Sequence, residues 1–512
     1  MQEILKVFKG LMVTIVVVLL CTALCTVAGT RSAEAQQTVD LTLERMVELG
    51  LRDSYRVKQL EIGIEQRRAR LNAERAGMRS RVDLDLSGPD VRSISDYQWD
   101  SNLGRSVLVY QDTRRYEAEL SIRQPVILFG YPTNGYLSVN NRMYRYDQVT
   151  RDDVRYYNRY FLRYNQPLFQ PNSMRNNLEE AELSLEEAEL SYTDDIVRMI
   201  IDLAGDHLNI FEAAYKKILA EEKVAALEEA ADAAAHVVLG DPARSIEVDQ
   251  IDVALANAQE EVQQAASSYR LQAARIKQRL RLPQEDSLVV DPAVTLDPVN
   301  VDVDQAVHYA MTLSPRMRRL DITQRGNEIR LEGTRARQAF RMNLRLTYGR
   351  EVQDPRFEKL WSEPRNTYTL RLDANIPIWD WGQRKYRIQA QEYNLERTEL
   401  RMEEASTDIQ TRVENNVRNV QEFEQRALSM QANLERAKQI TATTIESYAN
   451  GEVTLVDVLH TIDRQAVTAI NFLDAYLGWR DSLFDLQRAT YWDFHRDAEV
   501  LDRFGIVVEE GN

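Results

Sequence analysis

Strict alternation of apolar and polar residues is the clearest local pattern in the sequence, and it is cleanest from Tyr368 to Ile376. Such a period of two gives a strand one apolar and one polar face. One strand of this kind also occurs in soluble sandwiches, but successive arginine, aspartate and asparagine residues suit a water-filled barrel better. Residues 81–86, 161–169 and 341–348 alternate in the same way, so the sequence predicts four membrane strands. Their predicted polar side carries Asp83, Asp85, Asn343, Arg345, Arg371, Asp373 and Asn375.

A helical period dominates the rest of the chain. Residues 171–239 and 382–448 each predict one helix of about 68 residues, or about 100 Å at 1.5 Å per residue. Return helices follow, to about residue 281 and about residue 494. In the second long helix, apolar or small residues recur every seven positions, which is typical of a coiled-coil seam. The seam consists of Val413, Val420, Ala427, Leu434, Thr441 and Tyr448.

An internal repeat organises these elements, because residues 41–86 align without a gap with residues 301–346 at a separation of 260 positions. Each repeat is predicted to contain a helix of about 40 residues, two strands and a long helical hairpin. The predicted parts are a first repeat at 36–282, a linker at 283–304, a second repeat at 305–496 and a tail at 497–512.

The first repeat contains an insertion, residues 87–160, that is dense in tyrosine. Residues 116–122 alternate as well as residues 161–169 do, so either stretch could be the second strand of this repeat. Repeat spacing favours 161–169, because only that choice gives the two repeats long helices of equal length. The insertion is then a long connection between strands, with room for an extra hairpin.

The N-terminus predicts export. Two lysines precede an apolar run at residues 11–24, and residues 33–35 offer a small-residue cleavage pattern, so residues 1–35 are interpreted as a signal peptide. A membrane anchor is the alternative, although the run is short for a spanning helix. Both cysteines, Cys21 and Cys25, fall in this segment, so the exported chain has neither disulfide nor thiol chemistry.

Charge and motifs exclude several classes of function. The net charge of −16 and the lack of a basic stripe argue against a nucleic-acid partner. The sequence contains no HExxH motif, no phosphate-binding Gly-rich loop and no nucleophile elbow. We therefore predict no catalytic residues, no metal site, no cofactor and no enzyme activity.

The hairpin tips are the candidate functional sites. At the second tip, near 448–457, Asn450 and Gly451 predict a left-handed turn that ends the first helix. Asp457 and His460 lie three positions apart and so share one face of the next helix. At the first tip, near 240–247, the candidate residues are Gly240, Asp241, Arg244, Glu247 and Asp249, of which Glu247 or Asp249 is the counterpart of Asp457.

Four strands cannot close a barrel alone, so closure needs other copies of the chain. A homotrimer supplies twelve strands and arranges the long helices into a hollow α-helical barrel. Trp379 and Trp381 follow the last strand and are predicted to form an aromatic girdle against outer-membrane lipid, in preference to packing between barrel and helices. Such a molecule is a conduit across the periplasm; the alternative is a non-conducting structural tether of the outer membrane.

Three motifs carry a family resemblance: residues 375–384 before the long helix, Tyr448-Ala449-Asn450-Gly451, and Leu455-Val456-Asp457-Val458-Leu459. They resemble the TolC-like outer membrane efflux protein family. The resemblance implies a trimeric channel in the outer membrane that extends into the periplasm. It further implies a periplasmic adaptor protein and an inner-membrane pump or ATP-driven (ABC) exporter, for efflux of small toxic compounds or for type I protein secretion.

The same resemblance implies roles at the tip. Asp457 matches an acidic position that rings the periplasmic entrance, and Tyr448 matches a tyrosine that holds the closed tip. His460 stands where some members have a second acid, and Val453 stands where an arginine is common. We therefore expect the closing contacts to differ here, with Arg244 as a candidate source of the missing charge.

Overall fold

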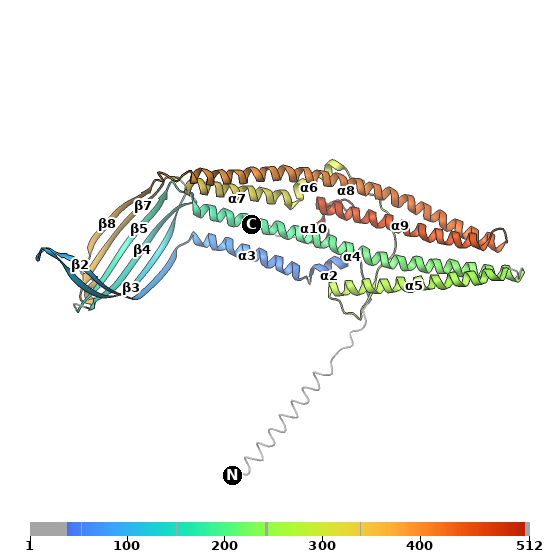
Figure 1. Cartoon of the computed structure of the whole chain (residues 1–512), viewed down its shortest axis with the longest axis horizontal. Coiled ribbons are helices and arrows are strands. Elements are labelled where there is room, and N and C mark those ends of the chain that lie inside the picture. The colour runs from blue at the N-terminus through green and yellow to red at the C-terminus, as the bar shows by residue number, and fades with distance from the viewer. Residues whose placement is uncertain (1–37, 53, 150–151, 241–243, 338, 507–512) are drawn as a thin grey trace, which may run out of the picture. The chain divides into compact units, whose positions relative to one another are not determined.

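The computed structural model describes residues 38–52, 54–149, 152–240, 244–337 and 339–506 (Figure 1). The predicted signal peptide with Cys21 and Cys25, and Asp241 at the first tip, lie outside these residues. The chain forms two compact units. We call them the strand-bearing unit and the helical unit. The described parts of the strand-bearing unit are 54–149, 152–198, 301–337, 339–416 and 486–506, and those of the helical unit are 38–52, 199–240, 244–300 and 417–485.

A six-stranded antiparallel sheet is the centre of the strand-bearing unit, with the strand order β2-β3-β4-β5-β7-β8. The prediction of four strands per chain is therefore wrong in number. The strands are β2 (Arg81–Asp100), β3 (Arg105–Leu128), β4 (Tyr131–Gln148), β5 (Asp153–Leu168), β7 (Arg341–Asp354) and β8 (Arg365–Asn375).

The predicted insertion 87–160 accounts for the two additional strands. It completes β2, supplies all of β3 and β4, and begins β5. Repeat spacing favoured residues 161–169 over residues 116–122 as the second strand of the first repeat. In the structure both stretches form strands, because residues 116–122 lie in β3 and residues 161–169 largely in β5. A hairpin adds two antiparallel strands and returns the chain to the end from which it started. Comparison with the second repeat therefore does not reveal the two additional strands.

The sheet has one polar and one apolar face. Direct pairs on the polar face include Asp85 with Glu119 and Asn343 with Asp373, and Leu84 with Leu120 is a pair on the apolar face. A register shift between Ser87 and Asp90 adds one residue to β2. Because of this bulge, Tyr97 and Trp99 keep to the same face as Leu84 and Leu86.

Two helices precede β2 and two precede β7, instead of the single helix of about 40 residues that the sequence predicted for each repeat. The break falls at Ser54 and at Ser314, which are 260 positions apart and have nearly the same dihedral angles, φ −70° with ψ 126° and φ −70° with ψ 124°. Each serine hydroxyl accepts a hydrogen bond from the amide two residues later. The four helices are α2 (Leu43–Arg52), α3 (Tyr55–Gly77), α6 (Val303–Leu313) and α7 (Pro315–Arg337).

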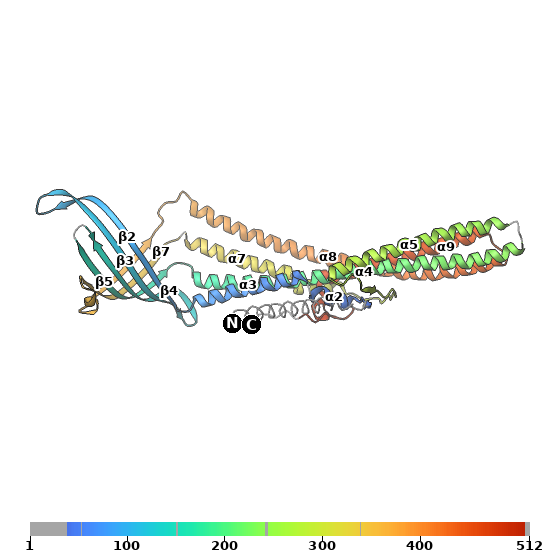
Figure 2. The ribbon, with the colours of Figure 1, turned by 90° about the horizontal axis from the view of Figure 1, so that it is seen from below.

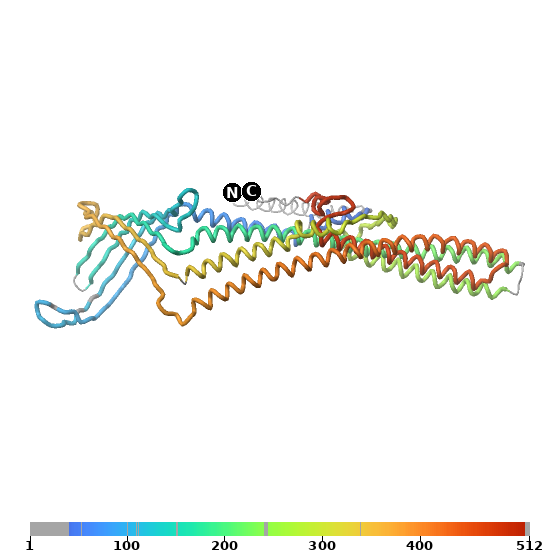
Figure 3. The backbone as a smooth tube through the Cα atoms, turned by 90° about the horizontal axis from the view of Figure 1, so that it is seen from above, coloured from blue at the N-terminus to red at the C-terminus, as the bar shows by residue number. Residues whose placement is uncertain are grey.

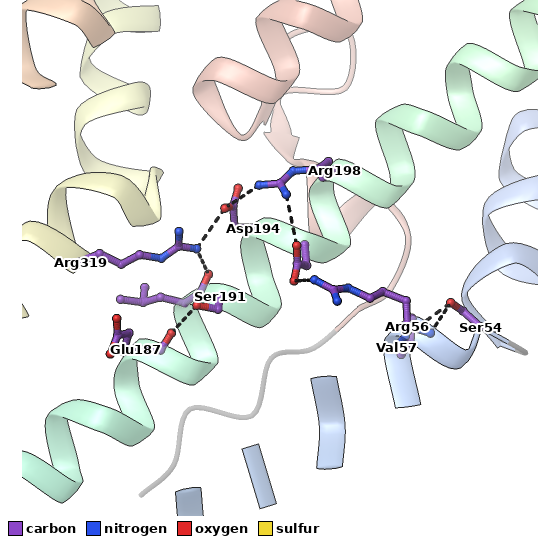
Figure 4. A network of polar contacts seen from close by, with 10 residues as sticks. Ser54, Arg56, Val57, Glu187, Ser191, Asp194, Arg198 and Arg319 are labelled. Atoms are coloured by element: carbon purple, nitrogen blue, oxygen red, sulfur yellow. Dashed lines mark hydrogen bonds and ion pairs between the residues drawn. The ribbon is translucent and has the colours of Figure 1, made fainter. Parts of the chain in front are cut away.

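Asp194 on α4 (Ser173–Gly240) joins several elements of the strand-bearing unit (Figure 4). It accepts hydrogen bonds from Arg319 of α7 at 3.1 Å and from Arg198 at 3.1 Å, and from the Tyr491 hydroxyl at 2.7 Å. The neighbouring Asp195 accepts a bond from Arg56 of α3 at 2.8 Å. Two adjacent carboxylates thus connect α4 with α3, α7 and the segment after α9.

Long helical hairpins form most of the helical unit, where α4 runs beside α5 and α8 beside α9 (Figures 2 and 3). The predicted seam residues on α8 are all buried, from Val413 to Tyr448. Helices α5 and α9 are each 36 residues long and start 210 positions apart. Their bounds are α5 (Ser245–Leu280), α8 (Gln383–Ala449) and α9 (Leu455–Thr490).

Short elements complete both units. The N-terminal strand β1 pairs in parallel with β6 in the linker, and a small antiparallel pair, β9 with β10, follows α9. Within the part of the chain that the structure describes, we find no helix with the length and apolar character of a membrane span. The short elements are β1 (Thr38–Asp40), β6 (Ser287–Val289), η3 (Phe357–Trp361), β9 (Trp492–Asp493), β10 (Ala498–Glu499) and α10 (Val500–Arg503).

We predict that Asp194→Asn destabilises the strand-bearing unit by about 2 kcal/mol, because charge-assisted bonds to Arg319 and Arg198 are lost. Burial raises the pKa of Asp194, but the bonds from Tyr491 and Arg319 outweigh it, so the pKa lies below its usual value. The native state therefore holds Asp194 ionised. The contribution of Asp194 to the free energy of unfolding is complete above pH ~4 and is lost as the pH falls further.

Thermal unfolding followed by circular dichroism between pH 7 and pH 2 measures this effect. The difference in unfolding midpoint between the wild type and Asp194→Asn should become smaller below pH ~4. Glu187→Gln makes the same chemical change at an exposed position on the same helix and should leave the midpoint unchanged. A gap that is constant with pH would contradict the proposed role of the carboxylate.

Candidate functional site

The tip of the second hairpin begins with a helix end that Gly451 makes possible. Gly451 has a φ of 76°. Its N–H donates to the carbonyl of Tyr448 at 2.9 Å, and the N–H of Glu452 donates to the carbonyl of Ser447 at 2.9 Å. This pair of bonds satisfies the last carbonyls of α8, and it requires a left-handed residue at Gly451. The left-handed turn predicted from Asn450 and Gly451 is confirmed.

Asp457 caps the start of α9 together with Thr454. Its Oδ2 accepts bonds from the Thr454 N–H at 3.0 Å and from the Thr454 hydroxyl at 2.6 Å, while its own N–H donates to Thr454 Oγ1 at 3.4 Å. The bonds from Thr454 and the nearby His460 hold the pKa of Asp457 below its usual value. Asp457 is therefore an exposed carboxylate that remains charged in moderately acidic solution.

The first tip has a different pair at the same place. Helices α5 and α9 begin 210 positions apart, so Arg244 corresponds to Thr454, and Glu247 corresponds to Asp457. The Arg244 Nε donates to Glu247 Oε1 at 2.9 Å. An ion pair thus stands where the second tip has a capping box.

Tyr448 joins the two tips. Its hydroxyl donates to Glu247 Oε2 at 2.6 Å, and the guanidinium carbon of Arg244 lies 5.3 Å from the centre of its ring. The Tyr448 side chain is fully buried, and Glu247 and Arg244 are mostly buried. Burial and the bond to Glu247 raise the pKa of Tyr448 to about 12, so the hydroxyl remains a donor throughout the physiological range.

An apolar cluster lies beneath this polar contact. Val453, which stands in place of the arginine common in the family, packs against the cluster. An apolar side chain at this position fills space in the cluster, and Arg244 as a substitute for the missing charge stays a prediction. The buried members are Leu227, Ala230, Ala234, Ile251, Ala258, Ile445, Tyr448, Leu455, Val458 and Ile462.

The structure therefore divides the predicted tip residues into two groups. Tyr448, Arg244 and Glu247 come together in one contact. Asp457 and His460 share one exposed face of α9, as expected, and Asp249 is exposed on α5. Gly240 is the last residue of α4, next to the undescribed residues 241–243.

Two contacts at the tips were not predicted from the sequence. Thr454 was missed, although the spacing Thr-x-x-Asp before an apolar helix is the signature of a capping box. Glu247 was predicted only as one of two possible counterparts of Asp457. No local pattern could give its bond to Tyr448, which lies 201 positions away.

The sheet carries a second set of candidate residues. The register places the predicted lumen residues on one face, with Arg345 opposite Arg371 and Asn343 opposite Asp373, and with Asp83 and Asp85 on the same face of β2. Trp379 and Trp381 follow β8, are exposed, and contact each other at 5.5 Å between ring centres. Whether these residues line a pore or contact lipid stays a prediction.

We predict that Tyr448→Phe loosens the contact between the tips. A hydrogen bond to a carboxylate contributes about 2 kcal/mol to the stability of the contact. Its loss corresponds to a roughly 30-fold increase in amide hydrogen exchange at the tips, where exchange occurs through local opening. Hydrogen exchange at amides of residues 444–450 and 247–250 measures it. Tyr269→Phe removes a similar bond, to the carbonyl of Leu288, and should leave exchange at the tips unchanged. Equal protection in Tyr448→Phe and the wild type would contradict the role of the hydroxyl.

Comparison with known proteins finds one family model that matches part of the chain. The sequence profile of the outer membrane efflux protein family matches residues 324–490, about a third of the chain. No curated protein matches the chain.

Three solved structures illustrate the similarity in fold. The outer membrane protein VceC from Vibrio cholerae is 11% identical, with a TM-score of 0.62 over 88% of this chain and 95% of that one. The CmeC outer membrane channel from Campylobacter jejuni is 14% identical, with a TM-score of 0.56 over 92% and 91%. CusC is 12% identical, with a TM-score of 0.61 over 90% and 95%.

At these identities the solved structures establish the fold, and the profile match supplies the link in sequence. The profile covers the second long hairpin and its tip, where the motifs of the predicted resemblance lie. The predicted resemblance is confirmed over residues 324–490. Residues 324–490 match the outer membrane efflux protein family in sequence, and about nine tenths of the chain shares the fold of CusC.

Proposed function

We propose that three copies of the chain form a channel that conducts substrates from the periplasm through the outer membrane. The observation that carries this proposal is the two-faced sheet, whose exposed face is apolar and whose opposite face is charged. The family match and the fold support it. The following paragraphs give the physical argument for each part.

The apolar face of the sheet is suited to lipid. Leu84, Leu86 and Leu370 are 62%, 72% and 70% exposed in the single chain. Burying a leucine contributes about 2 kcal/mol, so a row of exposed leucines favours an apolar surrounding over water. The large apolar residues of this face are Val82, Leu84, Leu86, Leu120, Ile122, Leu137, Val139, Leu162, Leu346, Leu370 and Leu372.

The edges of the sheet favour assembly. Strands β2 and β8 are the two ends of the strand order, so each has one side of its backbone without a partner strand among the described residues. Pairing of β8 in one copy with β2 in the next is a head-to-tail contact, which closes into a ring when the rotation fits. Closure removes all edges, as a membrane sheet requires. The number three rests on the family resemblance.

Partners follow from the same proposal. The tip residues, including exposed Asp457 and His460, form the periplasmic entrance and the docking surface for an adaptor protein. An inner-membrane pump or exporter drives transport, so this chain supplies a passage without catalysis. Trp379 and Trp381, 74% and 86% exposed, mark the boundary between lipid and periplasm.

The tip contact is the proposed gate. Tyr448, Glu247 and Arg244 hold the two hairpins of one chain together. The MtrE structure from Neisseria gonorrhoeae represents the open state of that outer membrane channel, with a TM-score of 0.58 and 14% identity over 92% of this chain and 95% of that one. Opening in this protein would require that the Tyr448 contact loosen or move.

Single-channel recording in a planar bilayer tests the function. We expect discrete conductance steps from the purified full chain, because a polar face enclosed by a ring provides a water-filled path. A preparation treated to dissociate the trimer serves as the control and should give none. Absence of steps from intact trimers at any voltage would favour the tether, which needs no wet interior.

We further predict that Asp457→Ala lowers the preference for cations, roughly twofold or more, because three carboxylates at one entrance raise the local cation concentration. The depressed pKa of Asp457 keeps this preference intact until the pH falls below the usual range of an aspartate. Reversal potentials in a salt gradient, recorded from pH 7 to pH 3, measure it.

Two further variants separate charge from helix capping at this position. Asp457→Asn removes the charge and keeps an oxygen for the Thr454 N–H, so it should act like Asp457→Ala. Thr454→Ala weakens the cap and keeps the carboxylate, so it should retain the cation preference. If Asp457→Asn kept the wild-type preference, Asp457 would not lie at the entrance.

A further inference from the structure

Strands β3 and β4 are the feature of this chain that its internal repeat does not contain. Strand β2 begins 260 positions before β7, and the Pro167 of β5 lies 210 positions before Pro377, which follows β8. The repeat thus equates β2 with β7 and β5 with β8. In the second repeat β7 and β8 pair directly, whereas in the first repeat β3 and β4 lie between β2 and β5.

The additional hairpin is part of the sheet along its full height. Strand β3 pairs with β2 from Arg123 opposite Arg81 up to Arg105 opposite Asp100. Strand β4 pairs with β5 from Tyr136 opposite Asn165 up to Gln148 opposite Asp153. No direct pair joins β2 to β5 in the described residues.

The lower turn of the hairpin contacts the start of α4, where the sheet meets the helices. The Asn134 amide donates to the carbonyl of Pro171 at 3.2 Å, and the Ser173 hydroxyl donates to Asn134 Oδ1 at 2.7 Å. The Gln166 amide of β5 donates to the carbonyl of Thr133 at 2.8 Å. These bonds tie the hairpin to elements of the repeat at the helix-bearing end of the sheet.

The hairpin also has the same two faces as the strands beside it. Leu120, Ile122 and Val139 continue the exposed apolar face. On the other face the Arg142 guanidinium bonds to Glu119 at 2.7 Å and to Glu117 at 3.1 Å, across two strands. A hairpin outside the wall would need neither an apolar surface for lipid nor paired charges on its inner side.

We propose that β3 and β4 of each chain are strands of the barrel wall, so that the three-copy channel has an eighteen-stranded barrel. This inference rests on the proposed function, which supplies the ring of three copies. With strands about 4.8 Å apart and tilted by about 40°, eighteen strands form a backbone cylinder roughly 36 Å across, and twelve form one roughly 24 Å across.

The wider wall changes the outer-membrane end of the channel alone. Barrels of 16–18 strands enclose an open aqueous channel. The outer end then accepts larger hydrophilic cargo than a twelve-stranded barrel would. The added lumen surface carries the arginine and glutamate pairs of β3 and β4.

The repeat defines the competing arrangement. If β3 and β4 lay outside a twelve-stranded wall, β2 would pair directly with β5 in the register that β7 and β8 use. Leu344 faces Leu372 in that pair, and the matching positions are Leu84 and Leu162. In the structure Leu84 faces Leu120 instead. With β3 and β4 in the wall, these two strands lie between Leu84 and Leu162. The two residues are then about 14 Å or more apart, which no disulfide can span.

Paired cysteines distinguish the two arrangements in intact trimers, because the two natural cysteines, Cys21 and Cys25, fall in the predicted signal peptide. Oxidised Leu84→Cys/Leu120→Cys should form a disulfide within the chain in most molecules, detected as a linked peptide by mass spectrometry. Leu84→Cys/Leu162→Cys should stay at the background of the single variant Leu84→Cys. The reverse result, a link between 84 and 162 without one between 84 and 120, would overturn the inference.

Two further measurements separate this inference from the proposed function. Electron cryomicroscopy of the trimer in nanodiscs should show eighteen strands in cross-section, and twelve would overturn the inference while leaving the channel intact. Native mass spectrometry counts the copies. A number other than three would remove the proposed trimer, while the 84–120 disulfide would still place β3 and β4 in the wall.

Discussion

In the part of the chain that the structure describes, β2 and β8 each leave one side of the backbone unpaired, and this constraint governs the rest of the strand-bearing unit. A long sheet edge in water is a template for association, and in lipid it is not tolerated. The exposed leucines of one face add a second demand, because they favour lipid over water. The proposed closure with further copies would pair both edges and cover the leucines with lipid, and it would enclose the charged face at the same time.

The tips show how two related hairpins acquired different contacts. Arg244 and Glu247 occupy the positions of Thr454 and Asp457 at the start of the return helix. The second pair caps its own helix, whereas Glu247 also accepts the hydroxyl of Tyr448. A carboxylate at the same repeat position thus serves local helix capping in one tip and the contact between the tips in the other.

The additional hairpin of β3 and β4 shows how strands can be added to the sheet without moving the helices that follow it. Two antiparallel strands return the chain to the helix-bearing end, so α4 starts where it would start without them. The bulge between Ser87 and Asp90 keeps the apolar residues of β2 on one face beyond the insertion point. The polar pairs of Arg142 with Glu117 and Glu119 then continue the charged face across the new strands.

Elements with local signals could be predicted from the amino-acid sequence alone. The seven-residue seam ending at Tyr448, the turn at Gly451 and the alternation in β8 each follow from periodicity or from the backbone freedom of one residue. Strand count and the bond from Tyr448 to Glu247 were decided by tertiary structure. Alternation shows that a segment suits a strand but not which strand pairs with it, and contacts between distant residues leave no trace in local spacing.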